Sequence, residues 1–95
     1  MNREEAQSLV EAELEITKDK YNPIDCAVLE EETIEKPWGW VFFYQSKAYI
    51  ETGEFMHMLD GNAPIIINRN TAELIHTGTA HDIEYYITEY EKTFA

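Results

Sequence analysis

Carboxylates are the most abundant reactive groups in this sequence, which has 19 acidic residues among its 95. Two carboxylic acids with separated pKa values in one cleft would suit acid–base hydrolysis, as in glycosidases. No spacing here selects such a pair, and surplus carboxylates usually lie on a solvated face. We therefore expect a negative surface, made of Glu30, Glu31, Glu32 and Glu35, of Glu51, Glu54 and Asp60, and of Glu84, Glu89 and Glu91.

Histidine and cysteine offer two further kinds of chemistry. His57, His76 and His81 fall in three different expected elements and form no two-histidine helical motif, so we predict no metal site. Cys26 follows the pattern of a strand with apolar neighbours, where a cysteine behaves as a small core residue. We therefore predict no cysteine nucleophile, no catalytic residues, no cofactor and no enzyme activity.

The formal net charge of -12 limits the choice of partners. It repels nucleic-acid phosphates and anionic lipid, so we expect no nucleic-acid and no membrane partner. A basic protein is the natural partner, and solubility alone is the alternative explanation of the charge. A lone Cys26 and a start without a signal sequence or membrane span predict the cytoplasm. The oligomeric state stays open, a homodimer included.

The first third of the chain predicts a helix and then a strand. Asn2 and Glu5 have capping-box spacing, and a helical apolar pattern follows to about Lys18. The alternating pattern from Ile24 to Leu29 predicts a strand. The acidic residues before Lys36-Pro37 are expected in a hairpin connection.

The aromatic segment from Trp38 to Tyr44 predicts one central strand that is covered on both faces. Its aromatics, Trp40 among them, could form a recognition stripe, but core packing is favoured because a small domain needs its largest apolar side chains. Tyr86 and Tyr90 are expected in the core for the same reason. The second face of the strand is covered by the last helix and the middle segment, or leaves aromatics free for a partner.

Glycines frame the middle of the chain. Gly53 and Gly61 enclose a predicted short helix over Glu54 to Leu59, which Gly61 stops in a left-handed conformation. Gly61-Asn62-Ala63-Pro64 lacks the further glycines and the lysine of a phosphate loop. We expect it to be scaffold, with Asn62 tying the turn through its side chain and Pro64 opening the next strand.

The last third predicts a hairpin and a helix. Ile65 to Ile67 and Glu73 to Thr77 are expected to pair through a turn at Asn68 to Thr71. After Gly78, Thr79 and Asp82 have capping-box spacing. The helical stripe that follows is the clearest in the chain, with apolar residues at Ile83, Tyr86, Ile87, Tyr90 and Phe94.

This order of elements predicts one α+β domain over residues 1–95. We expect a mainly antiparallel sheet of about four strands, with an N-terminal and a C-terminal helix packed on one face of it.

The stretch from Trp38 to Tyr90 resembles the immunity protein 35 family, also called YrhB-like domains. The resemblance rests on a combination of motifs, and the matching residues are Trp40, Phe42, Ser46, Tyr49, Glu51-Thr52-Gly53, Leu59, Gly61-Asn62-Ala63-Pro64, Ile66-Ile67, Thr71, Gly78-Thr79-Ala80, Ile83, Tyr86 and Tyr90. One departure stands out. The family usually places Thr-Gly after the triple-apolar strand, whereas this sequence has Thr71-Ala72, so a left-handed residue there would be strained or the turn rebuilt.

The resemblance implies a bacterial cytoplasmic protein that binds and neutralises a cognate toxin of an interbacterial competition, or polymorphic toxin, system. The alternative that it implies is a small chaperone-like protein that binds unfolded clients. No catalytic residues carry over from the family. Specificity for one toxin is expected on exposed variable surface, and the candidates are the segment Glu30 to Glu35 and the loop from Glu51 to Asp60.

Overall fold

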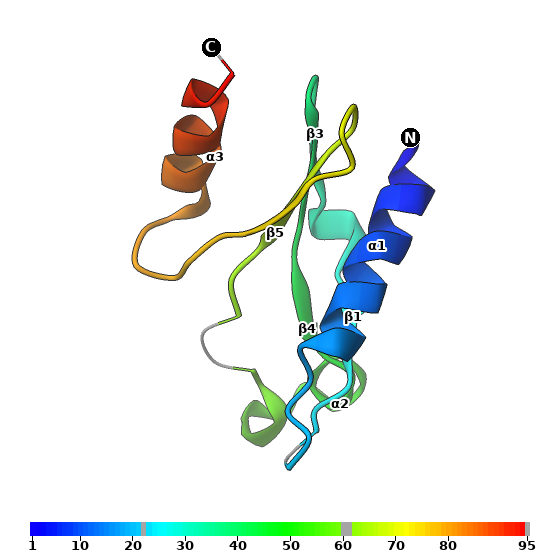
Figure 1. Cartoon of the computed structure of the whole chain (residues 1–95). Helices are drawn as coiled ribbons and strands as arrows, with labels where there is room; N and C mark the ends of the chain where they lie inside the picture. Colours follow the sequence, from blue (N-terminus) through cyan, green and yellow to red (C-terminus); the bar gives the residue numbers. More distant parts are fainter. Residues whose placement is uncertain (22, 60–61, 95) are drawn as a thin grey trace.

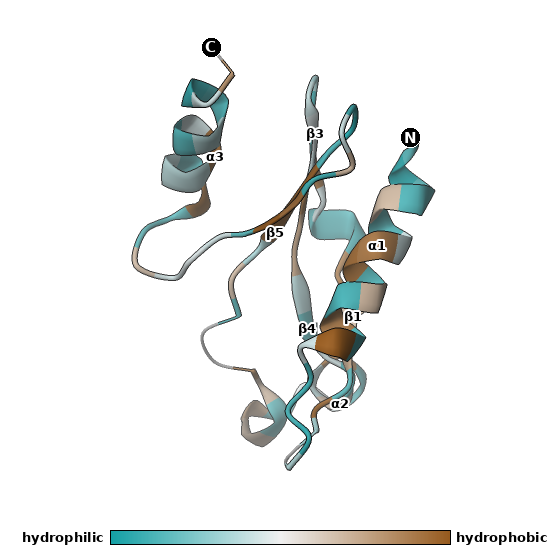
Figure 2. Ribbon diagram, viewed as in Figure 1, coloured by the Kyte–Doolittle hydropathy of each residue, from teal (hydrophilic) through white to brown (hydrophobic). Residues whose placement is uncertain are grey.

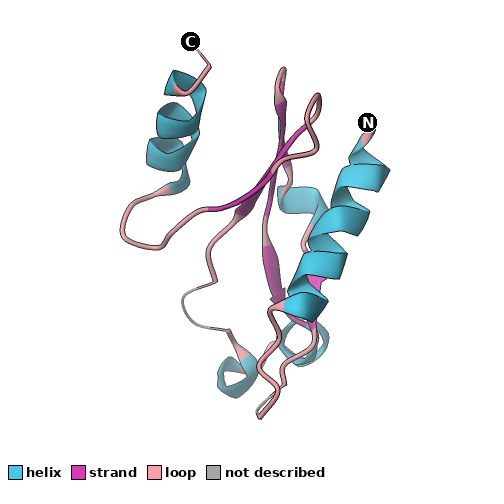
Figure 3. Ribbon diagram, in the orientation of Figure 1, coloured by secondary structure: helices cyan, strands magenta, loops and turns pink. Residues whose placement is uncertain are grey.

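The computed structural model describes residues 1–21, 23–59 and 62–94. Its architecture is α+β, as predicted (Figures 1 and 3). Two short 3₁₀ turns, η1 (Glu30–Glu32) and η2 (Phe55–His57), accompany the regular elements. In chain order these elements are α1 (Arg3–Ile16), β1 (Cys26–Val28), β2 (Ile34–Lys36), β3 (Gly39–Phe42), β4 (Tyr44–Ser46), α2 (Lys47–Thr52), β5 (Ile65–Asn68), β6 (Leu74–His76) and α3 (Ile83–Lys92).

The first helix begins where the sequence predicts. The Asn2 side chain accepts a hydrogen bond from the Glu5 amide at 2.8 Å, and the Glu5 carboxylate accepts one from the Asn2 amide at 2.9 Å. This capping box satisfies two amides that the first turn cannot pair internally. The helix ends at Ile16, before the expected limit at Lys18, and its buried side is formed by Ala6 and Val10.

Four antiparallel strands form the central sheet in the order β2-β3-β5-β6, and β1 pairs separately with β4. Side chains alternate along β5, so that Ile65 and Ile67 pack toward α1 and Ile66 packs toward α3. The hydrophobic colouring of Figure 2 is strong along β5, where it crosses the middle of the molecule. Both faces of β3 and β5 are therefore apolar and need a cover.

The two helices cover opposite faces of the sheet, which corrects the expectation of helices on one face (Figure 3). On the α3 side, Ile87 and Tyr90 pack with Trp38, Val41 and Ile66, and the rings of Trp38 and Tyr90 lie 4.9 Å apart. The last helix thus covers the second face of the central strand without the middle segment.

The start of α3 differs from the prediction at Thr79. Asp82 itself is the N-cap, and its carboxylate accepts a hydrogen bond from the Tyr85 amide at 3.1 Å. Thr79 is exposed in the bend before the helix, so the capping box of Thr79 with Asp82 is wrong. Aspartate is among the strongest N-cap residues, which explains why the helix begins directly after it.

The aromatic segment forms two strands instead of one. β3 is buried along its whole length between β2 and β5, as predicted for a central strand, but it ends at Phe42. Phe42 pairs with Ile65, and the residue before Ile65 is Pro64, which has no amide hydrogen to extend the ladder. Beyond this point β4 continues with β1 as its partner.

The middle helix lies earlier than predicted. α2 covers Lys47–Thr52, Ser46 caps its start, and Gly53 ends it in the left-handed conformation with φ of 72°. Only the single turn η2 forms within the predicted range Glu54 to Leu59. A serine N-cap and a left-handed glycine C-cap, with the six helical residues between them, account for the shift. The predicted cap Gly61 lies outside the described residues.

The last predicted hairpin is confirmed. β5 pairs with β6 from Ile65 opposite His76 to Ile67 opposite Leu74. The Asn68 side chain organises the turn by accepting hydrogen bonds from the amides of Asn70 at 2.9 Å and Thr71 at 3.1 Å. Ala72 takes the left-handed conformation, with φ of 62°.

Candidate partner-binding surface

The acidic triplet Glu30–Glu32 forms a bulge in an interrupted edge strand. Val28 faces Tyr44 in β1–β4, and Ile34 faces Val41 in β2–β3. The chain advances six residues from Val28 to Ile34 while the partners advance only three, so three residues are left without a cross-strand partner. They close into η1, and Glu35 lies in β2, so the acidic residues are not in the hairpin connection as predicted. The hairpin itself turns directly after Lys36, at Pro37 and Trp38, as the Lys36-Pro37 signal indicated.

The bulge is anchored at its first residue. The Glu30 carbonyl accepts a hydrogen bond from the Arg3 guanidinium at 2.5 Å, and the Glu30 carboxylate accepts one from the Gln7 side chain at 2.9 Å. Glu31 and Glu32 are exposed, and neither carboxylate has a hydrogen-bond or ion-pair partner among residues 1–21, 23–59 and 62–94. Two free carboxylates therefore project from a backbone that α1 holds in place.

Glu35 is part of a separate cluster. On β2 it lies opposite Trp40, and its carboxylate pairs with the Arg69 guanidinium at 2.9 Å. The same guanidinium lies 4.5 Å from the centre of the Trp40 ring, in cation–π geometry. Glu35 is thus locally neutralised, and Trp40 is a core residue with 2% of its surface exposed.

Glu51 and Glu54 belong to a third location. Glu51 lies on α2, and Glu54 directly precedes η2. The Glu54 carboxylate is 3.8 Å from the His57 ring. Figure 1 shows α2 at the lower end of the molecule, away from the teal turn η1 beside α1. The acidic candidates therefore form no single patch. Asp60, also a candidate, lies outside the described residues.

Residues of β4 hold the segment after α2 in place. The Ser46 hydroxyl donates to the His57 carbonyl at 2.5 Å and caps α2 by accepting from the Tyr49 amide. The Gln45 side chain accepts from the Leu59 amide at 2.6 Å, and the Asn62 side chain donates to the Tyr44 carbonyl at 2.5 Å. Asn62 therefore ties two distant segments together, in place of the local turn that the sequence predicts.

Sequence reasoning missed the apolar side chains that this segment presents. Phe55 is 82% exposed and Met56 is 80% exposed, and Met58 is exposed to 43%. We call these three residues the η2 platform. The only sequence signal is a short stretch rich in apolar residues, Phe55 to Leu59, shortly after Gly53, and it is too short for any periodicity to show.

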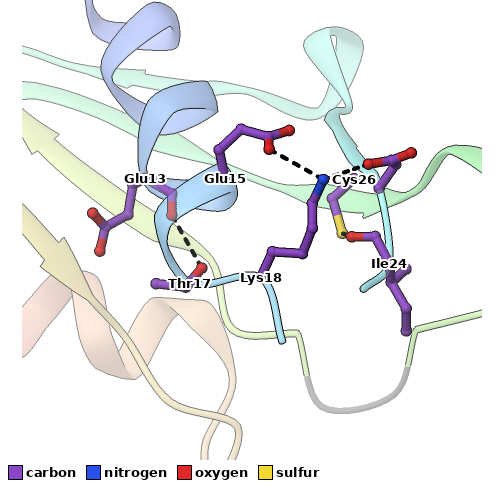
Figure 4. Close-up of polar contacts among 7 residues, drawn as sticks. Glu13, Glu15, Thr17, Lys18, Ile24 and Cys26 are labelled. Atoms are coloured by element: carbon purple, nitrogen blue, oxygen red, sulfur yellow. Dashed lines mark hydrogen bonds and ion pairs between the residues drawn. The ribbon is translucent and has the colours of Figure 1, made fainter. Parts of the chain in front are cut away.

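A lysine fixes the loop next to this platform. Lys18 Nζ lies 3.1 Å from the Glu15 carboxylate and 2.5 Å from the Asp25 carboxylate, and Figure 4 shows the Lys18 side chain reaching toward Glu15. The hydrogen bond and charge of Lys18 lower the pKa of Asp25, and the same bond raises the pKa of Lys18. Cys26, half-buried beside them, has its pKa raised by burial, which disfavours the thiolate.

The other predicted motif residues have scaffold contacts. A Cβ at Gly78 would lie 2.6 Å from the Tyr86 hydroxyl, so the lack of a side chain lets Tyr86 pack there. The Pro64 carbonyl accepts hydrogen bonds from the amide and the hydroxyl of Thr77. Tyr86 is half-buried, whereas Tyr90 is buried as expected.

The three histidines lie apart. His76 contacts Glu13 at 2.6 Å, and the His81 ring stacks on Tyr85 at 3.9 Å, far in sequence from His57 on η2. Within the described parts of the chain, no three side chains of histidine, cysteine, aspartate or glutamate gather to hold a metal ion. The helices among the same residues are all too short or too polar to cross a membrane.

Exposed apolar side chains on a backbone held by buried side chains, as in the η2 platform, are features of a protein-binding surface, and exposed carboxylates on an anchored turn, as in η1, suit its charged rim. Comparison with known proteins agrees with this class. The family model described as Immunity protein 35 matches residues 4–88, so the chain belongs to the immunity protein 35 family. The membership predicted from the motifs is thereby confirmed.

One relative is similar over a shorter region. The chain is 40% identical over 53 residues to the "Uncharacterized protein YrhB" of Escherichia coli (strain K12). The matched region covers 56% of this chain and 56% of the relative. No solved structure matches the chain. The family description points to an immunity function, to a toxin as the bound partner and to a non-enzymatic role.

Proposed function

We propose that this protein is a cytoplasmic, stoichiometric inhibitor that binds a basic toxin of an interbacterial competition system and performs no chemistry of its own. The observation that carries the proposal is the η1 bulge, in which Glu31 and Glu32 project from an anchored backbone without a partner among the described residues. Fixed carboxylates on a chain of net charge -12 attract a cationic protein and raise its rate of association.

Glu30, Glu31 and Glu32 would act as the electrostatic contact, with Glu51 and Glu54 as a second negative region. Glu35 would contribute less, because Arg69 already neutralises it. We expect such exposed charges to set mainly the association rate, which falls as salt screens them. Inhibition at an equimolar ratio, without turnover, is the corresponding functional outcome.

The proposal expects a toxin gene beside this one, and the test is the association rate of the purified product of that gene. In the double variant Glu31→Gln/Glu32→Gln, association at low salt should slow by about threefold or more, with a shallower salt dependence, as expected for rim charges. The matched control is Glu84→Gln/Glu89→Gln on α3, which removes the same charge elsewhere and leaves the rate nearer to that of the wild type. Equal rates for wild type and both variants would contradict the role of the bulge.

A second candidate function is a chaperone-like protein that binds unfolded clients. The 82% exposure of Phe55 and 80% exposure of Met56 favour it, because holding proteins present apolar groups to unfolded chains. Light scattering of an unrelated, heat-unfolded protein distinguishes the two functions. Suppressed aggregation at low molar ratio supports the chaperone, and no suppression together with tight binding of one toxin supports the inhibitor.

A further inference from the structure

The η2 platform combines strong exposure with a firmly held backbone. Phe55, Met56 and Met58 are exposed, yet the carbonyl of His57 and the amide of Leu59 are both bound by β4 side chains. These β4 residues are themselves buried, Gln45 with 7% and Ser46 with 2% of its surface exposed. The backbone of the η2 platform is therefore fixed by buried side chains, while the large apolar side chains of the platform are exposed to solvent.

A support of this kind lowers the cost of binding. Ordering a loop at an interface opposes association, and a loop that is ordered in advance avoids that loss. Gly53 contributes by ending α2 in the left-handed conformation, which turns the chain into η2. Aromatic and methionine side chains are also the types enriched in the centre of protein interfaces.

A groove of about 610 Å³ adjoins the platform and brings in charge. Its described lining includes Met56 and Met58 from the platform, Ile24 from the loop after α1, the carboxylates of Asp25 and Glu51, and the ammonium of Lys47; Asp25 is paired with Lys18 at 2.5 Å. Glu54 precedes the platform directly. Because Lys18 neutralises Asp25, the excess negative charge beside the apolar centre comes from Glu51 and Glu54, which outnumber the remaining ammonium of Lys47.

The charge beside the platform limits which kind of partner can bind there. A second copy of the chain would bring the same carboxylates and the same net charge of -12, and an anionic lipid surface would be repelled in the same way. A protein with an apolar pocket surrounded by lysine and arginine complements both the centre and the border. Resting on the proposed function, we infer that the η2 platform is the anchor that inserts into such a pocket on the basic toxin.

The anchor and the η1 bulge would then have different kinetic roles. Exposed rim charges act mostly on association, whereas apolar anchors buried at the centre of an interface act mostly on dissociation. Replacing Phe55 and Met56 by alanine should therefore shorten the lifetime of the complex and leave its formation rate close to that of the wild type.

The experiment measures both rate constants by surface plasmon resonance with the same purified toxin as in the test of the proposed function. We expect Phe55→Ala/Met56→Ala to dissociate about tenfold faster or more, as for interface hot spots. Phe55→Leu should lie between this variant and the wild type. Tyr85→Ala is the control, since Tyr85 is an aromatic residue 44% exposed on α3, and it should dissociate like the wild type.

Each outcome has one meaning. If the wild type binds and the Phe55→Ala/Met56→Ala variant keeps its lifetime, or if Tyr85→Ala shortens the lifetime equally, the anchor is overturned and the proposed function stands. If the wild-type protein does not bind the toxin at all, the proposed function fails first. Sedimentation that shows a dimer abolished by Phe55→Ala/Met56→Ala would also overturn the anchor, because a second copy would occupy the platform.

Discussion

Ala72 is the one described residue besides glycine that has a positive φ, at 62°. It occupies the position where the sequence departs from the family's usual glycine, and the turn keeps its left-handed residue instead of being rebuilt. Its amide donates to the Asn68 carbonyl at 2.9 Å, so the strained conformation closes the β5–β6 turn. A side chain in this region costs free energy that glycine avoids.

We expect Ala72→Gly to raise the free energy of unfolding by about 0.5–1 kcal/mol, because relief of the left-handed strain exceeds the added entropy of the unfolded chain. Urea unfolding followed by tryptophan fluorescence measures this. Ala80→Gly is the matched control, since Ala80 is exposed and has no positive φ. An Ala72→Gly protein that is no more stable than the wild type would show that the turn carries no such strain.

Two local signals in the sequence were accurate, whereas the capping box expected for Thr79 with Asp82 was not. Asn2 with Glu5 predicted the start of α1, and an Asn-containing turn predicted the β5–β6 hairpin. Side chains that act across the chain had no such signal. Asn62 bonds Tyr44 and Ser46 bonds His57, and only the folded sheet brings these partners together.

At the scale of elements, β3 depends on close contact with β5. A Cβ at Gly39 would lie 2.0 Å from the Ile67 carbonyl oxygen, which is backbone and cannot move aside without disturbing the ladder. Gly39 also pairs with Asn68 on β5 and with Lys36 on β2. Glycine is therefore required at the end of the hairpin that joins β2 to β3.

Gly39→Ala should lower the free energy of unfolding by more than about 2 kcal/mol, because the clash is with backbone in the middle of the sheet. Gly53→Ala is the comparison. There the φ is +72° but nothing lies within 4 Å of the added Cβ, so only the conformational cost of about 1 kcal/mol applies. Urea denaturation of the two variants gives both values, and equal losses would show that the approach of Gly39 to Ile67 does not matter.

Within the sheet, the features that the sequence did not predict, namely β2 and the division of the aromatic segment into β3 and β4, are set by long-range pairing. β1 (Cys26–Val28) pairs with β4, and β2 (Ile34–Lys36) pairs with β3, so both run along the same edge of the aromatic segment. The two pairings have different registers, and this offset leaves Glu30–Glu32 without cross-strand partners. Charge alone identified this triplet as exposed. Its shape, an anchored bulge instead of a hairpin loop, follows only from the pairing of both strands.

At the scale of the whole molecule, the two apolar faces of the sheet explain the placement of both helices. The apolar residues at both alternating sets of positions in Trp38–Tyr44 predicted a strand covered on both faces, and α1 and α3 supply this cover. The outer surface carries the excess charge of -12, and its ion pairs are few and exposed, such as Lys18 with Asp25 and Arg69 with Glu35. Exposed pairs of this kind contribute little to stability.

Repulsion among the carboxylates should therefore destabilise the fold by more than these ion pairs stabilise it. Added salt screens the repulsion and should raise the stability of the fold. Raising NaCl from about 0.01 M to about 1 M shortens the screening length from about 30 Å to about 3 Å, and we expect the free energy of unfolding to rise by about 1 kcal/mol. Urea is the denaturant, because it is uncharged. Glu31→Gln/Glu32→Gln should be more stable than the wild type at low salt and respond less to NaCl. A fall in stability with salt would mean that the ion pairs dominate, and a partner would then gain less from neutralising this surface.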